Sequence, residues 1–307
     1  MNELFIAFSN SLIALAICLA AGFFCRKKRM LNEVHSSGMS TLLTRITMPC
    51  MVFMSFMRPF SRELLMESIS TVVITGVIFI IAGFAGLWLA KLMKATPGER
   101  QNWQFGIAYP NVGFMGIPIV LAVFGTDGLI YAAMTQAAFC ILAFTVGVRM
   151  YDDAPKGFKL KELLVRSPAV PATAIGFVFF LTGFRLPWAI ESGIDLIGGV
   201  TTPLSMIIIG AALAQQSLKD SFTDVRLLPP VALKLVVIPI ISLLILRLFI
   251  PNPLMLSVIV TLMAMPPAAA TAIFAEEFKA DSLAAAKFVV VCTMLCLITV
   301  PLISLLL

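Results

Sequence analysis

Residues 103–125 read WQFGIAYPNVGFMGIPIVLAVFG, an apolar stretch interrupted at its centre by prolines and glycines. Proline removes a backbone donor and clashes with the carbonyl group four residues earlier, and glycine adds backbone freedom. We therefore predict that a helix here opens between about residues 109 and 116. Non-helical backbone at the depth of a membrane is tolerated only where it faces protein or a water-filled cavity. The residues that interrupt the stretch are Pro110, Asn111, Gly113, Gly116 and Pro118.

The rest of the chain is apolar enough to lie in a membrane. Of its 307 residues, 60% are hydrophobic and 12% are charged, whereas a soluble domain has about 25% charged residues. A helix needs ~20 apolar residues to cross the hydrocarbon core. The predicted fold is an all-α membrane protein of ten transmembrane helices. The predicted spans are 3–25, 33–57, 64–90, 103–124, 128–150, 167–183, 188–214, 227–250, 254–275 and 281–306.

The basic residues predict how the chain is oriented. Lys and Arg are concentrated in the loops that follow the first, third, fifth, seventh and ninth spans, and the loops on the other side hold Arg58, Arg62, Arg185 and Arg247. Positively charged loops stay in the cytoplasm. We therefore predict a multi-pass inner (plasma) membrane protein with both termini in the periplasm and the loop 151–166 in the cytoplasm.

The two halves of the chain resemble each other. Pro203 lies 154 residues after Pro49, and the same offset relates FGTDGL at 124–129 to FKADSL at 278–283. These matches predict two five-helix repeats, 1–150 and 167–307, joined by the connecting loop. Because five is odd, the second repeat would enter the membrane from the opposite side. Inverted repeats of this kind are a common plan of secondary transporters.

The second repeat is interrupted at the matching place. Residues 260–278 read VTLMAMPPAAATAIFAEEF, where Pro266 aligns with Pro110 after a two-residue gap. A break at the membrane centre exposes a half-helix N-terminus, whose unpaired N–H groups and partial positive charge favour anions. A simple proline kink is the alternative interpretation. The candidate substrate-binding residues at the two breaks are Pro110, Asn111, Gly113, Gly116, Pro266, Pro267 and Thr271.

These features resemble the auxin efflux carrier family, which includes plant PIN-type carriers and bacterial malate or malonate permease-like proteins. The motif YPNVGFMGIPI at 109–119 is the most specific, and TMPCMVF at 47–53 also matches. The resemblance implies that the fourth and ninth spans cross at the midplane and that the substrate is an organic anion, with Asn111 at the crossing. It also implies a scaffold of the first, second, sixth and seventh spans, often used for dimerisation. The other spans would form a transport domain that moves as an elevator.

Three polar side chains inside the predicted spans are further candidates. Arg45 lies midway along the second span, where a charge costs roughly 2.5–3.5 kcal/mol on insertion scales. We expect it either to bind a substrate carboxylate bidentately or to pair with Asp195 or freed carbonyls. Gln136 is a candidate ligand or a hydrogen bond between helices. Lys234, about two turns into the eighth span, is expected to extend its ammonium group to the interface.

Motifs for other functions are absent from the sequence. There is no HExxH, GxSxG or Walker sequence, so we predict neither an enzyme nor an ATP-driven pump, and no cofactor or metal. The prediction is a secondary transporter of a small mono- or dicarboxylate, coupled to protons or the membrane potential, or uncoupled. An exporter of neutral or amphipathic compounds and a non-transporting membrane sensor stay open. The expected partners are the anion, the lipid bilayer and a second copy of the chain, without nucleic acid.

Overall fold

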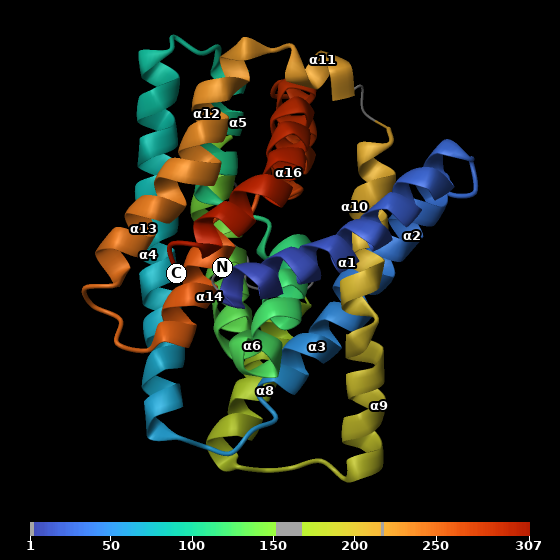
Figure 1. Ribbon diagram of the computed structural model, residues 1–307, viewed down its shortest axis with the longest axis vertical. Coiled ribbons are helices and arrows are strands. Elements are labelled where there is room, and N and C mark those ends of the chain that lie inside the picture. Colours follow the sequence, from blue (N-terminus) through green and yellow to red (C-terminus); the bar gives the residue numbers. More distant parts are fainter. Residues whose placement is uncertain (1–2, 152–167, 216–217) are drawn as a thin grey trace.

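The computed structural model describes residues 3–151, 168–215 and 218–307 (Figure 1). Most of the predicted connecting loop, from 152 to 166, lies outside these residues. In the first half the helical elements are α1 (Glu3–Lys27), α2 (Glu33–Leu42), η1 (Leu43–Thr47), α3 (Met48–Ser55), α4 (Arg62–Leu92), α5 (Pro97–Ala108), η2 (Val112–Gly116), α6 (Ile117–Leu142), η3 (Ala143–Gly147) and η4 (Val148–Met150). In the second half they are α8 (Ala169–Thr182), α9 (Trp188–Gly199), α10 (Thr201–Leu213), α11 (Leu218–Phe222), η5 (Val225–Leu227), α12 (Leu228–Ala232), η6 (Leu233–Val237), α13 (Ile238–Leu246), α14 (Pro253–Met263), α15 (Ala270–Glu277) and α16 (Ser282–Ser304).

The fold is all-helical, as predicted. Within the described residues, the extended pairing consists of one isolated bridge between two residues. In the part of the chain that the structure describes, six helical stretches are long and apolar enough to cross a membrane: Phe8–Lys27, Arg62–Leu92, Val112–Met150, Trp188–Leu213, Val225–Leu246 and Ser282–Ser304. The chain is therefore a multi-pass membrane protein by length and composition. The number of ten spans and the inverted repeat stay predictions.

The first broken span begins earlier than predicted. α5 begins at Pro97, six residues before the predicted start at 103, because Thr96 and Glu99 form a reciprocal capping box with a proline in the first turn. The break predicted between residues 124 and 128 is confirmed by a kink inside α6. There Gly125 interrupts the helix with φ 66° and ψ −161°, a conformation that side chains other than glycine rarely adopt.

Three π-helical segments share one local cause. The segments η1, η2 and η6 each precede a helix whose second residue is proline, namely Pro49, Pro118 and Pro239. A proline cannot bond to the carbonyl group four residues earlier and clashes with it, so the preceding turn widens. Turns of this kind are frequent at functional sites. The candidate Arg45 lies in η1, and Lys234 lies in η6.

The helices form two groups on either side of α6. In Figure 1, α1, α2, α9 and α10 lie on one side of the molecule, and α4, α12 and α13 lie on the other. Within the first group, α1 and α10 cross at touching backbones. A Cβ atom at Gly22 would overlap the carbonyl oxygen of Ile207, and one at Gly210 would overlap that of Leu19. Small residues permit this close approach in membrane helices.

Candidate functional site

The two breaks are joined by backbone hydrogen bonds. The N–H group of Asn111 donates to the carbonyl oxygen of Pro266 at 2.7 Å, and the N–H group of Ala268 donates to that of Tyr109 at 2.9 Å. Together they pair Pro110 with Pro267 in an antiparallel bridge. The prediction that both spans lose helical geometry at these prolines and approach each other there is confirmed.

Asn111 caps the half-helix that follows the first break. Its side-chain oxygen accepts from the N–H group of Phe114 at 3.2 Å, and its backbone oxygen accepts from Gly116 at 2.9 Å. The residue is 8% exposed. Because the side-chain oxygen is used by the cap, the amide NH₂ is the part of Asn111 that remains to donate to a ligand.

The two candidate glycines create room for neighbouring chains. A Cβ atom at Gly113 would lie 2.9 Å from Met48 Cε and 3.3 Å from Gln136 Oε1. A Cβ atom at Gly116 would lie 2.6 Å from Leu262 Cδ2. The structure thus brings Gly113 and Gln136 together, with α3 packed against them, and it brings Gly116 against α14.

Gln136 is buried beside the first break, at 6% exposure. Its Nε2 donates to Cys140 Sγ at 3.1 Å, while its buried Oε1 has no hydrogen-bond partner among the described residues. The positions of the oxygen and nitrogen atoms in a glutamine side chain are assigned from their hydrogen-bond partners. A rotated Gln136 would present its NH₂ donor toward Gly113, on the side that faces the break.

Thr271 lies in the first turn of α15, after the second break. Its N–H group donates to Ala268, and its carbonyl group accepts from the Tyr151 hydroxyl at 3.3 Å. Its own hydroxyl oxygen is buried without a partner in the described part of the chain. A buried polar atom without a partner costs about 1–3 kcal/mol, so this hydroxyl is a candidate ligand group.

Lys234 contradicts the expectation that its ammonium group extends to the interface. The side chain is 1% exposed, and Nζ donates to the carbonyl oxygen of Ile107 at 3.2 Å. Ile107 belongs to the last turn of α5, immediately before the first break, where unpaired carbonyls favour a cation. The signal in the sequence was a lone cation within an otherwise uncharged apolar stretch.

Arg45 is not brought to the bridge. It is exposed on η1, three residues before Met48, and no described residue forms an ion pair with it. The alternative pair with Asp195 is therefore not formed. Instead, Asp195 lines a pocket of about 570 Å³ together with Arg58 and Arg185.

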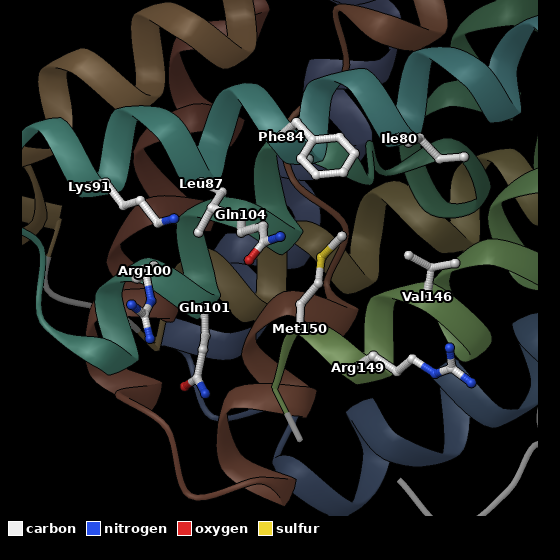
Figure 2. Close-up of a pocket in the computed structure, with 11 residues that line it drawn as sticks. Ile80, Phe84, Leu87, Lys91, Arg100, Gln101, Gln104, Val146, Arg149 and Met150 are labelled. Carbon is white, nitrogen blue, oxygen red and sulfur yellow. The ribbon is translucent and has the colours of Figure 1, made fainter. Parts of the chain in front are cut away.

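A pocket that the sequence reasoning missed lies between α4, α5 and η4. It measures about 410 Å³, and Figure 2 shows its lining side chains. Three of them are the basic residues Lys91, Arg100 and Arg149. This group of residues is called the basic pocket below.

This chain is similar to known membrane transport proteins. A helical membrane chain with two bridged breaks has the plan of a carrier, in which broken helices form the binding region. The family model described as "Membrane transport protein" matches residues 7–164 and 155–304. The chain belongs to this membrane transport family, which confirms the resemblance to the auxin efflux carriers.

Individual relatives cover most of the chain. An "Uncharacterized transporter" of Methanothermobacter thermautotrophicus is 25% identical over 306 residues, which are 97% of this chain and 98% of that protein. "Uncharacterized transporter YfdV" of Escherichia coli (strain K12) is 23% identical over 289 residues, 89% of this chain and 88% of its own. A Rhizobium meliloti protein named "Putative malonate transporter" is 24% identical over 277 residues, 85% of this chain and 84% of its own.

Proposed function

We propose that this transporter is a secondary carrier of a small organic anion, a mono- or dicarboxylate, which binds where the two breaks meet. The observation that carries the proposal is the bridge between the breaks, with Lys234 buried beside it. The chemistry required is binding and release, so no covalent step is involved.

The electrostatics of the bridge favour an anion. Lys234 is the only side chain with a formal charge among the buried residues that the structure describes. The half-helices that begin after the breaks, at η2 and α15, add the partial positive charge of helix N-termini. A charged side chain inside a membrane protein is by default a candidate functional group. The name of the Rhizobium meliloti relative, which contains malonate, supports the same substrate class.

Three donors would bind the carboxylate in this proposal. They are the amide NH₂ of Asn111, the amide of Gln136 after rotation, and the hydroxyl of Thr271. Hydrogen bonds to a charged group contribute about 1.5–3 kcal/mol each. Asn111 and Gln136 are at most 8% exposed, so substrate entry requires the surrounding helices to separate.

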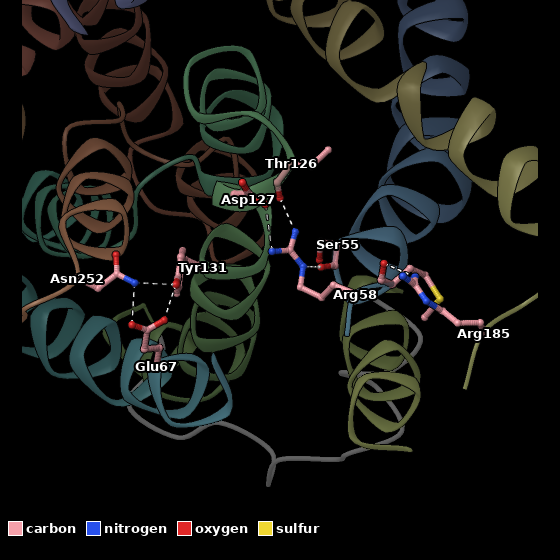
Figure 3. Close-up of polar contacts among 9 residues, drawn as sticks. Ser55, Arg58, Glu67, Thr126, Asp127, Tyr131, Arg185 and Asn252 are labelled. Carbon is pink, nitrogen blue, oxygen red and sulfur yellow. Dashed lines mark hydrogen bonds and ion pairs between the residues drawn. The ribbon is translucent and has the colours of Figure 1, made fainter. Parts of the chain in front are cut away.

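An elevator movement would provide that separation. Glu67 on α4 accepts from the Tyr131 hydroxyl of α6 at 2.5 Å and from Asn252, the cap of α14, at 2.7 Å (Figure 3). This network links three helices of the proposed transport domain, so they would move as one body. The bridge between the breaks would move with them.

Such a movement would have to break the contacts of Arg58 with Thr126 and Asp127. Arg58 follows α3 of the proposed scaffold, donates to the carbonyl oxygens of Ser55 at 3.0 Å and Thr126 at 2.8 Å, and pairs with Asp127 at 3.5 Å (Figure 3). Burial lowers the pKa of Arg58, although the carboxylate of Asp127 acts in the opposite direction. The arginine nevertheless stays charged. Arg58→Gln should therefore favour the conformation in which α6 has moved away.

Arg45 would distinguish dicarboxylates from monocarboxylates if it reaches the substrate from the scaffold. Arg45→Lys keeps the charge but loses the bidentate fork, so it should weaken a dicarboxylate about tenfold more than a matched monocarboxylate. Equal losses for both substrates would assign Arg45 a structural role. Thermal stability of Arg45→Ala provides the independent measurement of that role.

The orientation in the inner membrane belongs to the proposal. Both termini would face the periplasm, and a cysteine in place of Lys159, outside the described residues, should be labelled only after the cells are opened. Labelling of this cysteine in intact cells would indicate the opposite orientation. Dimerisation through α1, α2 and α8–α10 would be tested by cross-linking cysteines on the exposed face of α9.

Uptake into proteoliposomes tests the function. Radiolabelled malonate should accumulate and exchange with internal malonate, while a neutral amphipathic compound should not compete. Imposing a proton gradient and a membrane potential separately would identify the coupling. Binding of malonate without any flux would support the sensor alternative, and flux of the neutral compound alone would support the exporter alternative.

A further inference from the structure

The basic pocket gathers three cations that have no ion pair within the described part of the chain. Lys91 comes from the last turn of α4, Arg100 from the first turns of α5, and Arg149 from η4. The residues that line the pocket include no Asp or Glu, and none of the three cations forms an ion pair with any residue that the structure describes. Cations that converge from three elements without a carboxylate indicate an anionic ligand.

Two amide side chains complete the polar part of this pocket. Gln101 donates to the carbonyl oxygen of Tyr151 at 3.2 Å, which fixes its orientation at the wall. Gln104 lies one turn further along α5, and Figure 2 shows it beside Lys91 and Arg100. These groups can donate to phosphate or carboxylate oxygens that the cations attract.

The opposite wall of the basic pocket is apolar and exposed. Phe84 is 67% exposed, Ile80 is 41% exposed, and Val146 is 38% exposed. Ile80 and Phe84 continue a stripe of exposed apolar side chains along α4, a helix that is long and apolar enough to cross a membrane. In a bilayer such a stripe is covered by acyl chains.

We propose that the basic pocket binds the headgroup of an anionic phospholipid, with its acyl chains along Ile80, Phe84 and Val146. The cations would bind the phosphate, and the apolar wall explains why a lipid fits better than a free anion. Basic pockets between membrane helices are known to bind such headgroups. Because α5 runs from Arg100 directly to the first break, the lipid would be bound to the same half-helix as the substrate site.

Lipid binding to the purified full-length chain tests the proposal. The chain is transferred from neutral detergent into mixtures of phosphatidylglycerol and phosphatidylcholine, and retained lipid is measured by native mass spectrometry. We expect preferential retention of phosphatidylglycerol. Each cation contributes about fivefold at a membrane surface, so Lys91→Gln or Arg100→Gln should reduce retention about fivefold and the double variant about 25-fold. Lys28→Gln is the matched control, since Lys28 is an exposed cation outside the pocket and should change nothing.

A second set of measurements separates a lipid from a soluble anion. Phe84→Ser leaves the cations in place but removes part of the apolar wall, and it should weaken phosphatidylglycerol binding about fivefold. Inorganic phosphate and malonate should neither bind at the pocket nor displace the lipid. Equal retention of both lipids, equal effects of the double variant and Lys28→Gln, or binding of phosphate that Phe84→Ser leaves unchanged would overturn the proposal.

Discussion

The two breaks reach the same backbone pairing with different side chains. The first is supported by polar groups: Asn111 caps η2, Lys234 donates to the last turn of α5, and Gln136 lies against Gly113. The second has no side-chain cap, because the residue before α15 is Ala269. In the proposed carrier, the first break would therefore provide most of the ligand groups, and the second would provide backbone shape and the hydroxyl of Thr271.

Proline explains why the two breaks depend on each other. Pro110, Pro266 and Pro267 have no N–H group to donate, so the bridge uses the N–H groups of Asn111 and Ala268 instead. Buried backbone groups need partners. Each break therefore satisfies a carbonyl group of the other, and neither would remain open in the membrane without its counterpart.

Among the substitutions at the two breaks, Asn111→Asp should reduce malonate binding the most. Aspartate keeps the oxygen that caps η2, but it removes the NH₂ donor and adds a charge that repels the substrate, at a cost of several kcal/mol. Malonate binding, measured by calorimetry, should fall more than a hundredfold while the thermal stability is retained.

Asn111→Ala is the matched variant at the same position. Loss of the cap should cost about 1 kcal/mol of stability, and loss of one hydrogen bond to the anion should reduce affinity roughly ten- to a hundredfold. Normal binding and transport by both variants would remove Asn111 from the site.

Lys234→Met should produce the next largest loss. The substitution removes the cost of burying a charge, but the carbonyl oxygen of Ile107 loses its side-chain donor. The two effects oppose each other, so the melting temperature should change little. Removal of a positive charge near the anion should reduce malonate affinity roughly tenfold. Affinity that stays unchanged while stability falls would limit Lys234 to a structural role at the end of α5.

Thr271→Val tests whether the second break contributes any ligand. The substitution removes the buried hydroxyl that has no partner in the described part of the chain and keeps the shape. If the hydroxyl binds substrate, malonate affinity should fall about tenfold, the lower end of the contribution of one hydrogen bond to a charged group. A gain in stability with unchanged affinity would place all the ligands on the first break.

The breaks could be predicted because proline and glycine act locally. Pro110 and Pro266 fix where the helices must open, and the repeat predicts that they correspond. The start of α5 was missed because Thr96 and Glu99 form a cap within a polar segment that hydropathy alone excludes from a span. The sequence does contain the signal for this helix start: Pro97 follows Thr96, and Glu99 lies three residues after Thr96.

The positions of the cations could not be predicted in the same way. Whether Lys234 reaches α5 and whether Arg45 faces outward depend on which side of a helix contacts its neighbours. Arg45 and Lys234 lie within the widened turns η1 and η6, where the regular helical period does not apply. The basic pocket was missed because its cations come from three segments that only the tertiary structure brings together.

Pro267→Ala should have the smallest effect, and it tests the second break as a purely structural element. The bridge uses the carbonyl group of Pro266 and the N–H group of Ala268, so the new N–H group at position 267 replaces neither. Stability should fall by about 0.4–1 kcal/mol, because the unfolded chain gains freedom. Malonate uptake should change less than twofold. A large increase in uptake would mean that the double proline restrains movement in the native chain, and this result would favour the sensor over the carrier.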